Sequence, residues 1–265
     1  MRYQYINITR SDAIISIELN RPEKHNALNI EMVKELHYAL DFVALDREIS
    51  VVVLRGNGSS FCAGADISWF QSTLQLNSDA RKEQFLLLGS LFQKLEAVPQ
   101  PTIALIHGNT IGGGLGLIAA CDFVLAASDT KMAFREVKLG IIPATIAPIL
   151  IRKIGSNYTN QLMISGRSFS AHEGKILGLI AQVEDKEHLN KALHNLLNQM
   201  QSNSPSAMQQ TKKLVKTLET VTPEQELSVC IDELAKAINS PDGKEGFSAF
   251  QEKRVTSWNN RQSVE

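Results

Sequence analysis

The chain has 265 residues, of which 43% are hydrophobic and 21% are charged, a composition typical of soluble globular proteins. This length is enough to bury a core without disulfides or metals, in one large domain or two modest ones. The 27 Lys and Arg against 28 Asp and Glu give a net charge of −1, which argues against a dedicated nucleic-acid binder but allows a local basic patch.

Cysteine usage and apolar segments indicate the compartment. Three cysteines are an odd number in a long chain, so a reducing compartment is a simpler interpretation than a disulfide framework. Residues 1–5 contain no apolar stretch of the kind that a secretory signal needs. The most apolar region, 102–127, is interrupted by His107 and Asp122, which favours a buried strand–turn–helix over a membrane helix. We therefore expect a cytoplasmic protein.

The first elements follow clear patterns. Residues 13–19 predict a strand, which Arg21 and Pro22 end. Asn29 is the expected N-cap of a helix that runs to about residue 47, because apolar residues recur there at helical spacing. Residues 51–54 are all apolar and mostly β-branched, which is typical of a strand buried on both faces.

Strands and helices continue to alternate beyond residue 57. Residues 57–60 predict a turn, 80–97 a helix and 102–106 a third short strand. A glycine-rich segment follows, and then a short helix at 117–120 and a strand at 121–126. From about residue 144 the patterns are nearly all helical, and no repeat of fixed period is present.

Residues 61–67 combine small side chains after a buried strand with an approach to a helix. Small side chains let a ligand reach the main chain, and N–H groups at a helix start attract negative charge. The alternative is a tight turn packed on a sheet.

The three consecutive glycines of 112–114 again free backbone N–H groups, which could form half of an oxyanion site. Gly114, Gly116 and Ala119 also match the dinucleotide pattern G-x-G-x-x-A. The match comes late in the chain, and Asp129 is too near for a ribose-binding acid, so the dinucleotide interpretation is disfavoured.

Glu136 is the candidate acid or base, because it stands in an apolar neighbourhood where burial raises a carboxyl pKa. The alternative is a surface glutamate flanked by Arg135 and Lys138. Cys62 is either a reactive thiol or a small buried side chain. The six histidines lack ligand spacing, so we predict no metal site.

Five segments keep a fixed order along the chain: residues 20–29, 62–66, 112–122, 136–143 and 244–254. In this order and at this separation they resemble the motifs of the crotonase (enoyl-CoA hydratase/isomerase) superfamily, over essentially the whole chain. The resemblance implies an α/β fold, a spiral of ββα units followed by an α-helical C-terminal region that trimerises, often as a dimer of trimers. The expected boundaries are 1–200 for the core with the CoA and catalytic site and 201–265 for oligomerisation.

The resemblance also implies a CoA thioester substrate, so coenzyme A is part of the substrate and we expect no separate cofactor. The expected partners are the acyl-CoA and further copies of the chain, with no nucleic acid and no membrane. By position, the two oxyanion-hole N–H groups fall on Ala65 and Gly113. They would stabilise the enolate that forms during the reaction, and losing one such donor typically costs about 3–4 kcal/mol.

Hydratases of the family commonly use two glutamates around one water. Glu136 matches the second, but the chain has Gly116 where the first would stand. This departure leaves Glu136 to move protons by itself or through a water chain in the space left at Gly116.

A finer similarity, over 64–69, 114–122 and 136–148, points to a bacterial subgroup of methylglutaconyl-CoA hydratases and their isohexenyl relatives, from leucine and acyclic-terpene breakdown. The expected reaction is therefore addition of water to 3-methylglutaconyl-CoA. Arg135 is the expected partner of the second carboxylate of this substrate, because its guanidinium offers a bidentate fork, although it could instead face solvent.

Further residues are expected to bind substrate or CoA. Trp69 would wall the acyl pocket or pack in the core. Asp66 and Gly112 belong to the expected binding set next to the two donors. The adenine and phosphate end is expected near Lys24, Ala27, Ala63 and Ile67, with Lys253 contributing from the C-terminal helix or that helix being simply solvated.

Two other functions stay open. A single glutamate at position 136 also resembles the Δ3,Δ2-enoyl-CoA isomerases, in which one base shuttles a proton between carbons. The other is a non-catalytic CoA- or RNA-binding homologue, although the near-neutral charge gives no support for RNA.

Overall fold

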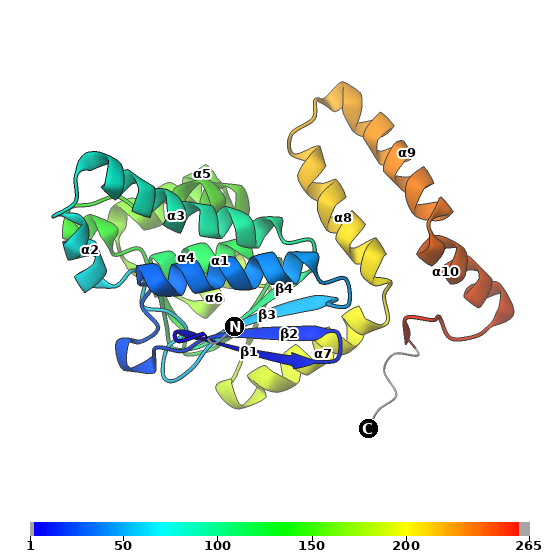
Figure 1. Cartoon of the computed structure of the whole chain (residues 1–265), viewed down its shortest axis with the longest axis horizontal. Helices are drawn as coiled ribbons and strands as arrows, with labels where there is room; N and C mark the ends of the chain where they lie inside the picture. Colours follow the sequence, from blue (N-terminus) through cyan, green and yellow to red (C-terminus); the bar gives the residue numbers. More distant parts are fainter. Residues whose placement is uncertain (1–2, 260–265) are drawn as a thin grey trace. The chain divides into compact units, whose positions relative to one another are not determined.

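Six strands form the main sheet, in the order β1-β2-β3-β4-β6-β9. Figure 1 labels the first four of them. The first two strands pair antiparallel, and all later neighbours pair parallel. Their bounds are Ile6–Ser11 (β1), Ile14–Leu19 (β2), Val51–Gly56 (β3), Thr102–Ile106 (β4), Phe123–Ala127 (β6) and Gln182–Glu184 (β9). The parallel arrangement explains why strands such as β3 and β4 are almost wholly apolar, since both faces of such a sheet are covered.

A second sheet has three short strands, in the order β5-β7-β8. They are β5 (Asn109–Ile111), β7 (Lys131–Ala133) and β8 (Ser168–Ser170). The chain places one strand in each sheet and then forms a helix: β4 and β5 precede α4 (Gly113–Ala120), and β6 and β7 precede α5 (Ala147–Ser165). This confirms the expected spiral of ββα units and brings successive loops to the same edge.

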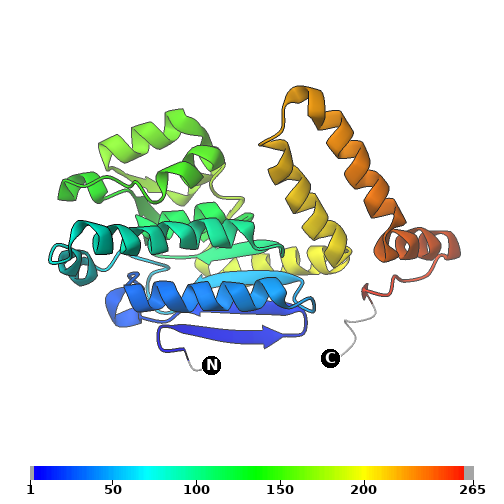
Figure 2. The ribbon, with the colours of Figure 1, turned by 45° about the horizontal axis from the view of Figure 1, so that its top comes forward.

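Helices α1 (Ile30–Leu45) and α3 (Ser78–Ala97) lie side by side over one face of the main sheet (Figures 1 and 2). Alternate residues of β2, Ile15 and Ile17 among them, point into the core that these helices cover. Short helices α2 (Ile67–Thr73) and α6 (Ala171–Ile176) and three 3₁₀ turns, Pro22–Lys24, Glu136–Leu139 and Lys186–His188, complete this part.

The structure describes residues 3–259, which form two compact units: residues 3–98 with 102–193, and residues 99–101 with 194–259. Helix α7 (Leu189–Gln201) begins in the first unit and ends in the second. The second unit contains α8 (Pro205–Leu218), α9 (Pro223–Asn239) and α10 (Pro241–Glu252), each of which follows a Ser or Thr N-cap and opens with a proline. Within this unit α9 packs against both other helices.

Most predicted elements of the first half are confirmed. Oδ1 of Asn29 accepts a hydrogen bond from Met32 N–H at 2.9 Å and so caps α1 as expected. The start of the glycine-rich helix was placed wrongly, because α4 begins at Gly113 and not at residue 117. The nearly all-helical interpretation beyond residue 144 is confirmed by α5 to α10, but it missed β8 and β9. Each has only three residues, too few to show a strand pattern, and each is stabilised by pairing with a distant strand.

Candidate active site

The loop after β3 runs parallel to β5 and leads toward α2. Cys62 pairs with Thr110, its N–H and carbonyl bonding the two neighbours of Thr110 at 3.2 and 2.9 Å. The two segments run in the same direction and stay close beyond this bridge, because a Cβ atom on Gly64 would lie 3.1 Å from the carbonyl oxygen of Ile111 and 3.9 Å from Cα of Gly112. A Cβ atom on Gly114 would lie 2.8 Å from the carbonyl oxygen of Cys62, so glycine is needed for the two segments to approach this closely.

The orientation of the Ala65 N–H follows from its pairing with Leu28. Leu28 N–H donates to the Gly64 carbonyl at 2.7 Å, and Asp66 N–H donates to the Leu28 carbonyl at 2.8 Å. The Gly64 carbonyl and the Ala65 N–H belong to one planar trans peptide and point in opposite directions. The Ala65 N–H therefore points away from Leu28.

The N–H of Gly113 lies at the first residue of α4. Two hydrogen bonds hold the preceding residue, Gly112. Its N–H donates to the Ala133 carbonyl at 3.0 Å, and its carbonyl accepts from Leu115 N–H at 2.8 Å. First-turn N–H groups have no acceptor inside their own helix. Within residues 3–259, neither the Ala65 N–H nor the Gly113 N–H has a hydrogen-bond acceptor. Two free donors thus lie in neighbouring segments, one just after Gly64 and one just after Gly112.

The carboxylate of Glu136 lies next to the glycine that precedes one of these donors. A Cβ atom on Gly112 would be 2.7 Å from Oε1 of Glu136. Oε2 of Glu136 is buried and has no hydrogen-bond partner among the described residues. Burial raises the pKa of Glu136 above its ordinary value, and the nearby N–H groups of Glu136 itself and Arg135 offset part of this effect. Such a carboxylate can take a proton from a bound reactant.

The space beside Gly116 is filled by apolar side chains. A Cβ atom on Gly116 would lie 2.4 Å from Cγ2 of Ile146 and 2.8 Å from Cε1 of Phe92. Both side chains are about 1% exposed. The water chain that the sequence allows at this position therefore has no room, and the departure from two glutamates leaves a dry, packed contact.

Both carboxylate oxygens of Asp66 are engaged within the protein. Oδ1 accepts from the N–H groups of Ser68 (2.8 Å) and Trp69 (3.3 Å), which caps α2, and Oδ2 accepts from Nη2 of Arg21 at 2.9 Å. Burial raises the pKa of Asp66, but the hydrogen bond from Arg21 and those from the two N–H groups outweigh it, so the pKa lies below its ordinary value.

The residues expected at the adenine and phosphate end lie together in the first unit. Ala63 N–H donates to the carbonyl of His25 at 2.9 Å, and Ala27 N–H donates to the carbonyl of Lys24 at 3.0 Å. The Lys24 side chain is exposed, and Ile67, the first residue of α2, is 63% exposed. These positions border the loop that presents the Ala65 N–H.

The other predicted binding residues are placed differently. The guanidinium of Arg135 donates to the carbonyl of Gly166 at 3.4 Å and to the hydroxyl of Ser168 at 2.7 Å. Trp69 is 7% exposed and belongs to the core cluster, with its indole N–H donating to Gln84 at 2.6 Å. Lys253 follows α10 in the second unit and has a positive φ of 56°.

Other candidate chemistries find no support in the described part of the chain. Burial raises the pKa of the Cys62 thiol to about 12, so Cys62 is a buried side chain and not a reactive thiol. Residues 3–259 contain no group of three or more His, Cys, Asp or Glu arranged to hold a metal ion. None of the helices described is both long and apolar enough to cross a membrane.

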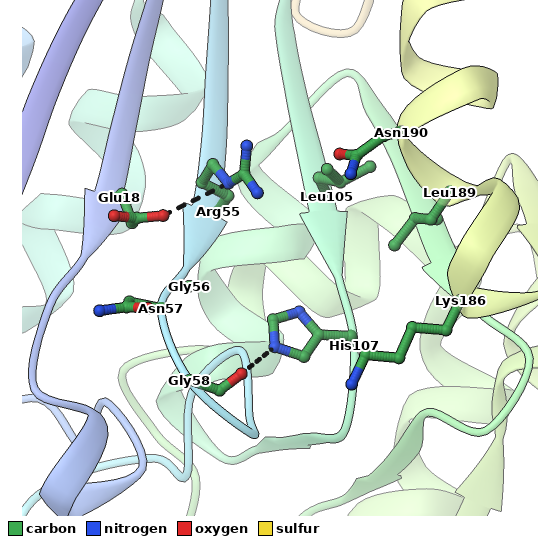
Figure 3. Close-up of a pocket in the computed structure, with 10 residues that line it drawn as sticks. All are labelled: Glu18, Arg55, Gly56, Asn57, Gly58, Leu105, His107, Lys186, Leu189 and Asn190. Atoms are coloured by element: carbon green, nitrogen blue, oxygen red, sulfur yellow. Dashed lines mark hydrogen bonds and ion pairs between the residues drawn. The ribbon is translucent and has the colours of Figure 1, made fainter.

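A cavity of about 250 Å³ opens at the carboxyl ends of β2, β3 and β4 (Figure 3). Its polar groups are largely paired among themselves: Arg55 lies 3.5 Å from Glu18, and Nε2 of His107 bonds the Gly58 carbonyl at 2.9 Å. Figure 3 shows the Lys186 side chain reaching toward His107. None of the predicted site residues lines this cavity.

Three residues near the donors were not predicted from the sequence. Arg21 lies within the first motif. The signal that could have found it is its charge, because a charged side chain in a segment that packs against an apolar loop needs a partner. Phe92 and Ile146 come from α3 and from the residue before α5, and nothing local indicates that they meet at Gly116.

Comparison with known proteins identifies the family of this chain. Residues 9–261 match the family described as Enoyl-CoA hydratase/isomerase. The 2,3-dehydroadipyl-CoA hydratase of Escherichia coli is 30% identical, over 96% of this chain and 98% of that protein. The crotonyl-CoA hydratase of Syntrophomonas wolfei is also 30% identical, over 96% and 97%.

Solved structures show the same fold over 97% of this chain. An enoyl-CoA hydratase from Shewanella pealeana superposes with a TM-score of 0.93 at 30% identity, covering 97% of each chain. Pseudomonas aeruginosa AtuE gives a TM-score of 0.93 at 33% identity, covering 97% of this chain and all of its own. The chain is therefore a member of the enoyl-CoA hydratase/isomerase family, within the crotonase superfamily.

Proposed function

We propose that this protein adds water across the α,β double bond of an enoyl-CoA thioester, with 3-methylglutaconyl-CoA of leucine breakdown as its substrate. The observation that carries the proposal is the pair of free N–H donors at Ala65 and Gly113, next to the buried carboxylate of Glu136. Relatives named as hydratases of two different enoyl-CoA thioesters support the reaction class.

The two N–H groups act on the thioester oxygen. When water attacks Cβ, electron density moves through Cα onto this oxygen and forms an enolate. Donors that are fixed before the reaction stabilise this charge without reorganisation. The pairing of Ala65 with Leu28 and the start of α4 at Gly113 provide this fixed geometry.

Glu136 moves the protons in this mechanism. Its carboxylate takes one proton from the attacking water as the oxygen bonds to Cβ, and the resulting carboxylic acid returns a proton to Cα of the enolate. The sum is one water added, with Glu136 restored. Because Phe92 and Ile146 fill the space at Gly116, where a second glutamate would stand, one carboxyl serves both steps. A raised pKa suits a group that must both accept and release a proton.

The acyl group is proposed from the similarity to the methylglutaconyl-CoA hydratase subgroup. The Escherichia coli relative is named for 2,3-dehydroadipyl-CoA, which like 3-methylglutaconyl-CoA is a thioester of a dicarboxylic acid. The bonds from Arg135 to Gly166 and Ser168 use two of its five N–H donors, which leaves three for the second carboxylate.

A second candidate function is favoured by the single carboxyl. An isomerase that converts a 3-enoyl-CoA to a 2-enoyl-CoA needs one base to remove a proton from Cα and return it to Cγ. The packed contact at Gly116 is compatible with this reaction, because no water has to be activated.

Product analysis separates these functions. The purified protein is incubated with 3-methylglutaconyl-CoA, crotonyl-CoA and 3-hexenoyl-CoA side by side, and the products are identified by mass. If the protein adds water fastest to 3-methylglutaconyl-CoA, the full proposal is supported. If it adds water fastest to crotonyl-CoA, hydration is supported but the proposed acyl group is contradicted. Conversion of 3-hexenoyl-CoA to its 2-enoyl isomer without hydration of the other two contradicts the hydratase.

A further inference from the structure

Two loops meet at the Ala65 donor, and several groups hold them together. The first loop, residues 20–29, precedes α1, and the second, residues 57–66, follows β3. The side chain of Asn26 joins them directly, since its amide donates to the carbonyls of Asn57 (2.8 Å) and Ser60 (2.9 Å). Asn26 is wholly buried and has a positive φ of 56°, so this contact outweighs an unfavourable backbone conformation.

Arg21 lies at the centre of this contact. Its Nη1 donates to the carbonyl of Ala27 at 2.6 Å, and its Nη2 donates to Oδ2 of Asp66 at 2.9 Å. The guanidinium also lies over the ring of Tyr5, 5.4 Å from the centroid, and the residue is only 8% exposed. A buried cation with two acceptors and an aromatic face is held in one orientation.

The two acceptors of Arg21 lie next to the β-bridge between Leu28 and Ala65, which orients the Ala65 N–H. Ala27 precedes Leu28, and Asp66 follows Ala65, and Leu28 and Ala65 are the bridged pair. The guanidinium thus fixes the residues on either side of the bridge. A shift of either loop would break the bond from Leu28 N–H to the Gly64 carbonyl and turn the Ala65 N–H.

We propose that Arg21, acting through Asp66 and Ala27, is a positioning residue that aims the Ala65 N–H at the thioester oxygen. Asp66 has the same task, and this explains why both of its oxygens bond protein groups. This inference rests on the proposed function, because the role it describes is stabilisation of an enolate by the Ala65 donor.

Lysine cannot replace Arg21 in this role. An ammonium group is a compact charge without the planar fork that reaches two acceptors in fixed directions. Arg21→Lys keeps the charge near Asp66 but loses one of the two bonds. Asp66→Asn keeps an oxygen for the α2 cap and weakens the bond to Arg21.

The test compares Arg21→Lys and Asp66→Asn with wild type by two readouts. The first is the kcat and KM of enoyl-CoA hydration. The second is the affinity for the enolate of acetoacetyl-CoA, followed by its ultraviolet absorbance, which reports enolate stabilisation without any turnover. We expect both variants to lose roughly ten- to a hundredfold in kcat and in enolate affinity, with KM changed less than about twofold. Arg10→Lys is the control, because Arg10 also bonds several acceptors, the carboxylates of Asp46 and Glu48 and the carbonyl of Asp12, but on an exposed surface.

The two readouts separate the inference from the proposed function. If wild type hydrates no enoyl-CoA but binds the enolate, and both variants weaken that binding, the positioning role stands and the hydratase proposal fails. If both variants match wild type in kcat and enolate affinity, the inference is wrong. It is also wrong if wild type does not bind the enolate. Should Arg21→Lys fail to fold, Asp66→Asn decides by the same criteria.

Discussion

A Cβ atom on Gly112 would lie 2.7 Å from Oε1 of Glu136, and the backbone of Gly112 has a positive φ of 48°. Two features therefore require glycine at this position: the positive φ of the backbone and the close approach of the carboxylate. Since the next residue supplies the proposed Gly113 donor, this contact couples the proposed base to one of the two proposed donors.

Gly112→Ala should impair both folding and activity. The added methyl group meets the Glu136 carboxylate, and the positive φ strains alanine by about 1–3 kcal/mol. We expect kcat/KM to fall by roughly a hundredfold, because the base is displaced from the reactant. Gly178→Ala is the control, since Gly178 has a φ of 81° and open space around it. It should lose stability and keep activity, and equal activity loss in both variants would contradict the account.

The pH dependence of kcat/KM should report Glu136. The base must be ionised to take a proton from water, so activity falls as pH drops below its pKa. Because burial raises this pKa, the acid limb should lie above 4.5, the ordinary value for glutamate. The profile is measured with a saturating and a limiting enoyl-CoA concentration. An acid limb at or below the ordinary value would show that Glu136 is not the titrating base.

Glu136→Gln should stabilise the fold at neutral and higher pH. A carboxyl whose folded pKa is raised binds more protons folded than unfolded, so its stabilising contribution is present below the unfolded pKa and lost as pH rises through the folded pKa. The variant should therefore melt at a higher temperature than wild type near pH ~8, with the difference vanishing near pH ~4. Glu173→Gln should behave in the opposite way near pH ~8, because the hydrogen bond from Arg167 lowers the pKa of Glu173. A lower melting temperature for Glu136→Gln would contradict the burial argument.

Gly116→Ala should destabilise the protein although alanine favours a helix by about 1 kcal/mol. The new methyl group overlaps Ile146 and Phe92, and such overpacking costs about 1–3 kcal/mol. Ile146→Ala removes the nearest atom, so the double variant should lose less than the two single losses combined. Urea unfolding of the four proteins measures this coupling. Additive losses would mean that Gly116 and Ile146 do not share the space.

The predicted trimer or dimer of trimers can be tested on α9. Four exposed apolar residues lie along one side of this helix at intervals of four, three and four: Leu227, Ile231, Leu234 and Ile238. Light scattering should give a mass of three or six chains for wild type and a smaller mass for Leu234→Glu. Asp232→Lys, on another side of α9, should leave the mass unchanged. A monomeric wild type would contradict the prediction.

Local patterns allowed the principal elements of the spiral to be predicted. Asn29 caps α1, and the apolar run at 51–54 forms β3, because both depend on neighbouring residues. The glycines of 112–114 and the loop ending at Ala65 were recognised as places where backbone N–H groups are free. The interpretation of these segments as donors stays a prediction, although the bridge between Cys62 and Thr110 brings the two segments together.

What the sequence could not show are contacts between distant residues. Arg21 and Asp66 are 45 residues apart, and only the meeting of two loops pairs them. The filling of the Gly116 space depends on Phe92 and Ile146, which come from separate elements. For Trp69 the sequence left pocket wall and core packing open, and the structure places it in the core cluster.

Hydration by wild type and Glu136→Gln, measured side by side, tests the central claim most directly. Both proteins are given 3-methylglutaconyl-CoA and crotonyl-CoA at one pH, and the hydrated product is quantified by mass. The account predicts that wild type adds water and that Glu136→Gln is slower by about a hundredfold or more. Near-full hydration by Glu136→Gln would contradict it.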